Sequence, residues 1–301
     1  MPLTPEPPKE HPSTYFVQDR ESQDELNRLQ AQDHMLTTDM GGVLPEQPDP
    51  TLFHHVLDVG CGTGGWLIET AKTYPSMSLL VGVDVSKRMI VSAREQAAAQ
   101  GVSDRVEFHV MDALRMLEFP TSFFDLVNQR LGQGYLRTWD WRKLLHEYQR
   151  VGRPGGVVRI TESASGYQNS NSPALAQLGE LGIKASYQAG HLFTPQEDGL
   201  LKELAGLMRQ HGLQDVQTRA YALGYRASTP QGQRFAEDMG QLFRTGLPFL
   251  RKWTRVSDDY EDIYQQMLRE IHQPDFVATW NLLTLWGKVP LSTENVPDHL
   301  S

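Results

Sequence analysis

The residues that could do chemistry are concentrated in a glycine-rich turn at positions 54–66, "HHVLDVGCGTGGW". Gly60, Gly62 and Gly65 satisfy the pattern G-x-G-x-x-G, and Asp84 follows at the end of the next predicted strand. Glycines let a backbone approach a ligand closely, and a carboxylate in that position can accept hydrogen bonds from ribose hydroxyls. This spacing alone predicts a nucleoside site of an unspecified kind.

Further motifs indicate which kind of nucleoside the site binds. Asp58 precedes the glycines to give D-x-G-x-G-x-G, and "VMDA" places Asp112 at the end of the third predicted strand, where a carboxylate could meet an adenine amino group. "FDLV" at 124–127 opens the fourth strand, and "RVGRPGGVVRI" at 150–160 supplies a Pro-Gly-Gly turn into the fifth. In this order and spacing, residues 52–165 resemble the class I S-adenosylmethionine-dependent methyltransferases.

The resemblance implies S-adenosylmethionine as cofactor. Asp58 suits a ligand with a sulfonium and an ammonium group, whereas it would repel the diphosphate of a nicotinamide oxidoreductase, the rival dinucleotide interpretation. Asn128 is expected just past the fourth strand, near the methionine moiety, while Met111 and Leu114 are expected in the core. Carried over position by position, the expected cofactor-binding residues are Asp58, Gly60, Cys61, Gly62, Asp84, Val85, Met89, Asp112, Ala113 and Asn128. Tyr15 is added because the N-terminal segment that contains it could fold over the cofactor as a lid.

Composition excludes several other classes. Lys and Arg number 28 against 37 Asp and Glu, a formal charge of −9, which disfavours a nucleic-acid partner. The single cysteine, Cys61, rules out an intrachain disulfide and a multi-cysteine zinc site, and no metal site is predicted. A reducing cytoplasmic location is the simplest interpretation. No apolar run approaches the roughly 18 residues that a membrane span needs.

Strand-like and helix-like segments alternate from residue 54 to residue 165, which indicates βαβ units and a mostly parallel sheet. We expect an α/β fold: a seven-stranded Rossmann-like methyltransferase sheet with an antiparallel last strand, and a helical cap. The sixth and seventh strands are predicted at 213–227 and 278–289. A helix is predicted to begin at Pro195, with Thr194 as its N-cap. The expected organisation is a disordered tail (1–14), a helical lid (15–40) and a methyltransferase domain (41–301) with cap inserts at about 163–193 and 229–276.

The methyl acceptor is predicted mainly by exclusion. The fourth strand continues as "NQRLGQGYL", without the Asn/Asp-Pro-Pro-aromatic motif of amino-methylating nucleic-acid enzymes of this fold, and no paired-glutamate loop typical of protein-arginine enzymes is found. Aromatic residues in the inserts favour a small, largely apolar metabolite of secondary metabolism. Carbon, oxygen and nitrogen atoms all stay open as the methyl acceptor. The alternative is a non-methylating cyclase or ligand-binding protein that keeps the cofactor as a scaffold.

Two side chains are candidates for a general base. His191 lies in the first insert, and Glu162 directly follows the predicted fifth strand, near the strand ends where ligands gather. A base is needed only where the acceptor carries a proton that it cannot shed unaided. The N-terminal helix is also placed where it could reach a neighbouring subunit, so a homo-oligomer is a further expectation.

Overall fold

The computed structural model describes residues 15–17, 22–166 and 169–291. Their seven strands form one sheet in the order β3-β2-β1-β4-β5-β7-β6. The first five pair in parallel, and β7 is antiparallel to both β5 and β6. This arrangement confirms the expected fold class. The strands are β1 (His55–Val59), β2 (Leu79–Asp84), β3 (Val106–Val110), β4 (Phe124–Arg130), β5 (Gly152–Ser163), β6 (Gln214–Arg226) and β7 (Val277–Lys288).

Helices cover both faces of the parallel strands. On one face, α2 (Gly65–Thr73) and α3 (Lys87–Ala99) bury Trp66 and Ile90 in an apolar cluster with β1 and β2. On the other, α4 (Asp140–Val151) and α6 (Leu201–Gln210) bury Trp141 and Met208 in a second cluster. Strands β1 and β2 are accordingly apolar along most of their length, and β4 is almost entirely buried, as expected for strands covered on both faces. Short 3₁₀ turns, η1 (Pro50–Leu52) and η2 (Gly132–Gly134), complete this part.

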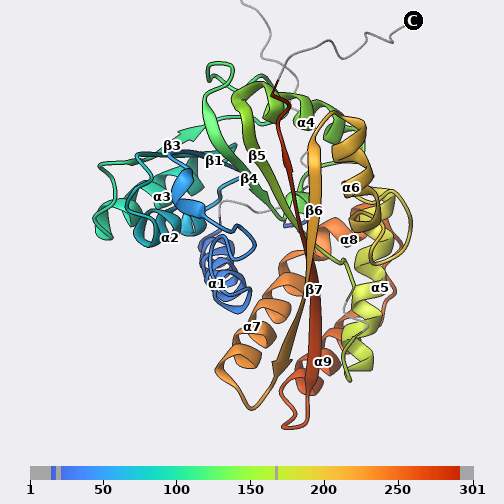
Figure 1. The fold of residues 1–301 in the computed structure, drawn as a ribbon. Helices are drawn as coiled ribbons and strands as arrows, with labels where there is room; N and C mark the ends of the chain where they lie inside the picture. Colours follow the sequence, from blue (N-terminus) through green and yellow to red (C-terminus); the bar gives the residue numbers. More distant parts are fainter. Residues whose placement is uncertain (1–14, 18–21, 167–168, 292–301) are drawn as a thin grey trace, which may run out of the picture.

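The cap is built around the long β6–β7 hairpin. Helices α5 (Pro173–Gln188), α7 (Pro230–Thr245), α8 (Leu247–Trp253) and α9 (Tyr260–Ile271) gather along it, away from α2 and α3 (Figure 1). A third apolar cluster joins them and contains the stacked rings of Tyr225 and Phe235, whose centroids are 4.5 Å apart. The cap therefore has a core of its own, continuous with the end of the sheet.

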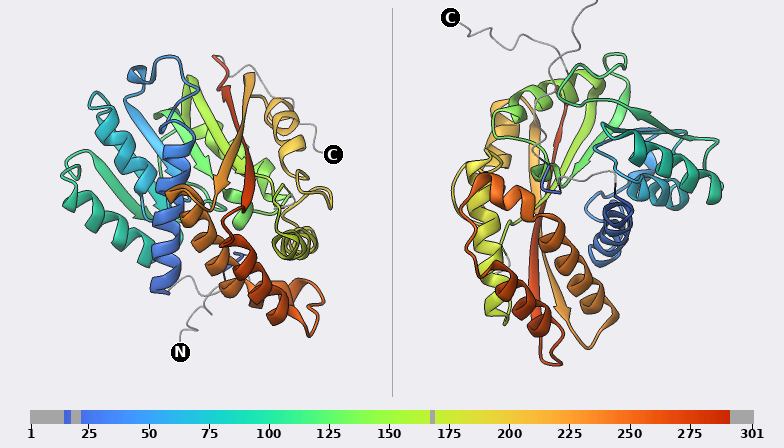
Figure 2. Two further views of the ribbon diagram at one scale, coloured as in Figure 1. Left: turned by 90° about the horizontal axis from the view of Figure 1, so that it is seen from below. Right: turned by 180° about the vertical axis from the view of Figure 1, so that it is seen from behind.

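Helix α1 (Gln23–Asp39) lies between the two parts, beside α2 and α7, as both views in Figure 2 show. Ser22 caps it by accepting a hydrogen bond from the backbone N–H of Glu25 at 3.1 Å. The buried guanidinium of Arg28 pairs with Glu25 at 2.8 Å and with Asp238 of α7 at 2.9 Å. The bond to Asp238 ties α1 to the cap. No helix among the described residues has the length and apolar character to cross a membrane.

Two predicted boundaries are wrong. The helix expected from Pro195 begins at Leu201, because residues 194–199 form a turn in which the Gly199 N–H donates to the Gln196 carbonyl. That turn also accepts a hydrogen bond from Ser165 through the Glu197 carbonyl, which holds it against the end of β5. The segment 15–17 is irregular rather than helical. The predicted tail (1–14) lies outside the described residues.

Candidate functional site

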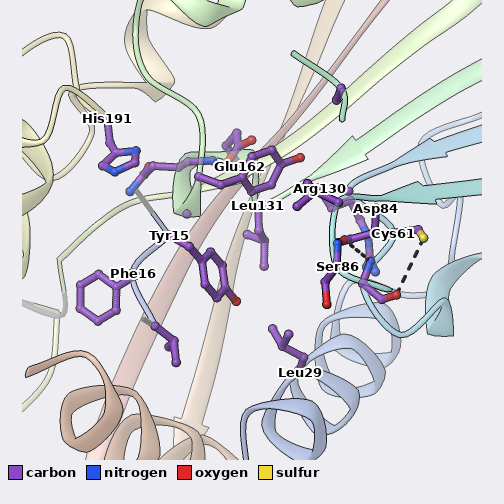
Figure 3. A pocket seen from close by; sticks show the side chains of 18 of the residues that line it. Tyr15, Phe16, Leu29, Cys61, Asp84, Ser86, Arg130, Leu131, Glu162 and His191 are labelled. Carbon is purple, nitrogen blue, oxygen red and sulfur yellow. Dashed lines mark hydrogen bonds between the residues drawn. The ribbon is translucent and has the colours of Figure 1, made fainter. Parts of the chain in front are cut away.

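A cavity of about 1880 Å³ opens at the carboxyl ends of the parallel strands and extends beneath the cap. The close-up view shows labelled side chains on two opposite sides of this cavity (Figure 3). Cys61, Asp84 and Ser86 lie on one side, and His191 lies on the other. Tyr15 stands between them, and we call the side beyond it the apolar chamber. The chamber is lined by Phe16, Leu131, Gly179, Gly182, Ser186, His191, Leu242, Phe243, Phe249 and Trp280.

The glycine loop between β1 and α2 presents bare backbone to the cavity. The N–H groups of Gly60 and Cys61 both donate to the Val83 carbonyl, at 2.8 and 3.0 Å, which holds the loop across β2. Gly60 has φ +69°, and a Cβ there would collide with the Tyr135 hydroxyl. At Gly62 (φ +52°) an added Cβ would meet no protein atom within 4 Å. The loop thus leaves a space that side chains would otherwise occupy.

Asp84 ends β2 directly beside this loop. One carboxylate oxygen accepts from the Gly62 N–H at 3.0 Å, and the other accepts from the Ser86 N–H at 2.8 Å. The two bonds fix the carboxylate at the cavity wall, and each oxygen can accept further hydrogen bonds. The arrangement can bind a pair of hydroxyl groups.

Asp58 is held from behind by a buried polar network. Asn128 donates to Asp58 at 2.7 Å and accepts from Arg159 at 2.8 Å, and Arg159 pairs with Glu46 at 2.7 Å. Burial raises the pKa of Asp58 to about 7, although Asn128 and Arg159 oppose that rise. The structure corrects the placement of Asn128: it lies within β4, fully buried, and contacts Asp58 rather than the cavity.

Glu162 lies inside β5, not beyond it, and is fully buried. Its carboxylate accepts from the backbone N–H groups of Gly132 at 2.7 Å and Gln133 at 3.1 Å and from the Gln129 amide at 3.0 Å. Burial raises its pKa to about 8, while these donors act in the opposite direction. Glu162 therefore anchors the turn that follows β4. Leu131 opens that turn with a left-handed backbone, φ +54°.

His191 is buried in the chamber wall, on the side opposite Cys61 and Asp84 (Figure 3). Its Nδ1 lies 2.6 Å from the Leu136 carbonyl, and its ring centroid lies 5.9 Å from that of Phe249. A carbonyl can only accept, so Nδ1 carries a proton, and Nε2 is the basic atom of the ring in its neutral form. Among the described residues, no group of His, Cys, Asp and Glu could hold a metal ion.

Comparison with known proteins decides the family. Residues 56–156 match the family model described as a methyltransferase domain. Demethylmenaquinone methyltransferase from Bacillus subtilis is 30% identical over 181 residues, which are 57% of this chain and 76% of that protein. The chain belongs to the class I S-adenosylmethionine-dependent methyltransferases. Its methyl donor is S-adenosylmethionine.

Other relatives extend the likeness. The 27-O-demethylrifamycin SV methyltransferase of Amycolatopsis mediterranei is 25% identical over 281 residues, 91% of this chain and 88% of that protein. The solved phosphoethanolamine N-methyltransferase 2 of Haemonchus contortus has a TM-score of 0.54 at 19% identity, covering 91% of this methyltransferase and 60% of that chain. The cyclase SpnF has a TM-score of 0.50 at 17% identity, covering 89% and 97%. The two structures agree in fold.

The residues of this methyltransferase fit the donor. Gly62 leaves open space at the loop, and Asp84 presents a fixed carboxylate beside it. No cation is needed to neutralise a pyrophosphate there, and the nearby Asp58 would repel one. The predicted residues that line the cavity are Tyr15, Asp58, Gly60, Cys61, Gly62, Asp84, Val85, Met89, Asp112, Ala113, Glu162 and His191.

Several lining residues of the methyltransferase escaped the sequence analysis. Met111 and Leu114, expected in the core, line the cavity while packing against the core. Arg130 and Tyr135 also line it and were not predicted. The fourth strand continues two residues past Asn128, so the side chain that reaches the cavity at its end belongs to Arg130. Alternation along a strand puts these two positions on the same face, a signal that the sequence did offer.

Proposed function

We propose that this methyltransferase acts on a small, largely apolar metabolite of secondary metabolism. The observation that carries the proposal is the apolar chamber, whose wall is mostly aliphatic, aromatic or glycine. Ligand pockets commonly measure 300–1,000 Å³, so a cavity of about 1880 Å³ has room for a donor and a sizeable acceptor together. The rifamycin methyltransferase, a relative named for the O-methylation of a metabolite, supports the same class of acceptor.

We assign the donor to the side of the cavity formed by the glycine loop. Asp84 would hold the ribose hydroxyls, and Val85 and Met89 would pack on the adenine. Asp112 and Ala113 would meet the adenine edge, at the rim of the cavity. Cys61 would face the donor as a small side chain, because burial and the neighbouring carboxylates raise the pKa of its thiol and disfavour a thiolate.

The bound donor supplies an electrophilic methyl group for in-line displacement. The chain's task is to align the acceptor and to exclude water. Tyr15 lies between the donor side and the apolar chamber, and its hydroxyl donates to Glu25 at 2.8 Å, so the ring is fixed there by α1. We assign Tyr15 to the lid that separates the reacting groups from solvent.

His191 is the better of the two candidates for a general base. Its Nδ1 proton is directed at the Leu136 carbonyl, which leaves Nε2 as the basic nitrogen, and the residue lines the chamber. Glu162 instead uses both oxygens to hold the turn at Gly132 and Gln133. We therefore propose that His191 takes the proton from an acceptor that carries one, and that Glu162 positions the turn.

The test is methyl transfer from donor labelled on the methyl group to a panel of apolar and polar metabolites. We expect label in apolar products that carry a hydroxyl, amino or activated carbon group. For a hydroxyl acceptor, replacing His191 with Gln should lower kcat by about 100-fold and remove the acidic limb of its pH profile. Transfer only to polar acceptors, or donor binding without transfer to any compound, would contradict the proposal.

A further inference from the structure

Several carboxyl groups line the donor side of the cavity. Asp33, Asp58 and Asp84 all line this region, around the glycine loop. The amino-acid tail of the donor brings a carboxylate of its own into these surroundings. A carboxylate leaving water needs a cationic or strongly hydrogen-bonding partner, because its desolvation is otherwise uncompensated.

Most cations in the cavity wall are already committed elsewhere. Arg28 uses Nε, Nη1 and Nη2 on Glu25 and Asp238. Arg115 is mostly exposed and faces Asp112 at the rim. Arg137 stacks on Trp139, and its buried Nε has no hydrogen-bond partner among the described residues, but the adjoining Thr138 N–H donates to Gly190, next to His191 and not to the glycine loop. Lys143 donates to the Leu114 carbonyl. Among the described residues, the cations that line the cavity are these four and Arg130.

Arg130 lies above the start of α2. It is the last residue of β4, and its guanidinium carbon is 5.8 Å from the ring centre of Trp66, the second residue of α2. Its side chain is 15% exposed and lines the cavity, and in Figure 3 it lies on the side of Cys61 and Asp84. The guanidinium is therefore fixed where the glycine loop passes into the helix.

A carboxylate already occupies this neighbourhood. Asp33 of α1 pairs with Nη2 of Arg130, and a Cβ at Gly65 would collide with the second Asp33 oxygen. The first turn of α2 directs positive N–H dipoles at that position. Nη1 donates to the Thr37 hydroxyl at 3.2 Å. A guanidinium has five N–H groups, so Arg130 keeps donors for a ligand after serving Asp33 and Thr37.

We propose that Arg130 binds the α-carboxylate of the donor's amino-acid tail, next to the first turn of α2. Asp33 holds the guanidinium in place from the α1 side. The assignment concerns the donor and is independent of the proposed acceptor. The proposed contact also links α1 to donor binding, because Asp33 of α1 and the donor carboxylate would share the guanidinium of Arg130.

The experiment compares two ligands by calorimetry. S-adenosylhomocysteine keeps the carboxylate, and S-adenosyl-3-thiopropylamine lacks only that group. We expect the unmodified protein to prefer S-adenosylhomocysteine by about tenfold or more, as for a charge-assisted hydrogen-bond pair. In Arg130→Gln this preference should fall to about twofold or less, while Arg130→Lys should keep part of it because the positive charge remains.

Arg244→Gln is the matched control. Arg244 also pairs with an aspartate of α1, Asp24 at 3.2 Å, but it lies outside the cavity wall. This variant should bind both ligands as the unmodified protein does. Equal affinity of the unmodified protein for the two ligands would overturn the proposal, with no need for a variant to fold. An undiminished preference in Arg130→Gln would also overturn it, whereas binding of neither ligand to the unmodified protein would contradict the donor assignment itself.

Discussion

The two carboxylates beside the glycine loop are in contrasting environments. Asp84 accepts from two backbone N–H groups at the cavity wall. Asp58 is 4% exposed and is held from behind by the Asn128 amide. A carboxylate fixed by N–H donors is suited to bind hydroxyl groups, whereas a buried one with a raised pKa is sensitive to pH. We therefore expect substitution of Asp84 to affect donor binding and substitution of Asp58 to affect the pH dependence of stability.

Replacing Asp84 with Ala should weaken binding of S-adenosylhomocysteine by at least ~1.5 kcal/mol, because charge-assisted hydrogen bonds to the ribose are lost. Calorimetric titration measures the change, and circular dichroism checks that the variant is folded. Glu107→Ala, an exposed carboxylate on β3, is the control and should bind normally. Unchanged affinity in a folded Asp84 variant would count against the donor site.

Asp58→Asn should alter how stability depends on pH. In the native state the pKa of Asp58 is raised to about 7, above the ordinary value of 3.8. Between these two pH values the carboxyl group is therefore protonated in the native state and ionised in the unfolded state. The unfolding free energy of the unmodified protein should therefore fall relative to the variant as pH rises from 4 to 7, by more than about 1 kcal/mol. Urea denaturation at several pH values measures this, and a pH-independent difference would refute it.

At the residue scale, the site residues that could be predicted from the sequence are those whose backbone conformation requires one residue type. Gly60 needs a positive φ and space beside Tyr135, so its glycine could be recognised from the motif alone. Arg130 could not be found in this way. Its position in the cavity depends on where β4 ends and on a partner, Asp33, 97 residues away along the chain.

At the element scale, α1 is held to the cap by a buried ionic bond and an exposed one. Arg28→Met would leave Glu25 and Asp238 buried without their cation, so we expect a loss of about 3 kcal/mol in unfolding free energy. Arg244→Met removes the exposed pair with Asp24 and should cost less than about 1 kcal/mol. Urea denaturation of both variants measures the difference, and equal effects would contradict this account of α1.

Helix α5 forms one wall of the apolar chamber. A Cβ at Gly182 would meet no atom within 4 Å, so Gly182→Leu should fold normally and fill the chamber. We expect methyl transfer to a large acceptor to fall by roughly tenfold or more, with the affinity for S-adenosylhomocysteine unchanged. Gly206→Leu on α6 is the matched control, since it also has open space but lies outside the cavity wall. Equal transfer rates in the two variants would contradict the proposal that the acceptor binds in the apolar chamber.

Element types were predicted better than their ends. Thr194 and Pro195 have the residue types of a helix start, yet the helix begins at Leu201. The turn at 194–199 prevails because the Glu197 carbonyl accepts from Ser165, a contact between distant segments. Helical periodicity likewise extends to residue 15 in the sequence, whereas Ser22 caps α1. Such contacts leave no local trace in the sequence.

At the scale of the whole molecule, the sheet could be predicted because its strands and helices alternate regularly. The apolar chamber could not be predicted in the same detail. It combines Phe16 from the N-terminal segment, Gly182 from α5 and Phe249 from α8, which meet only in the folded protein. The aromatic inserts indicated its character, and the packing of the cap on β6 and β7 determines its size.

Methyl transfer between the proposed donor and acceptor sites requires one continuous cavity in which the donor sulfur faces the apolar chamber. A crystal structure of the complex with S-adenosylhomocysteine tests this most directly. We predict the ribose on Asp84, the amino-acid carboxylate near Arg130, and the sulfur directed past Tyr15 towards His191. A nucleoside bound elsewhere, or a sulfur cut off from the chamber by protein atoms, would contradict the account.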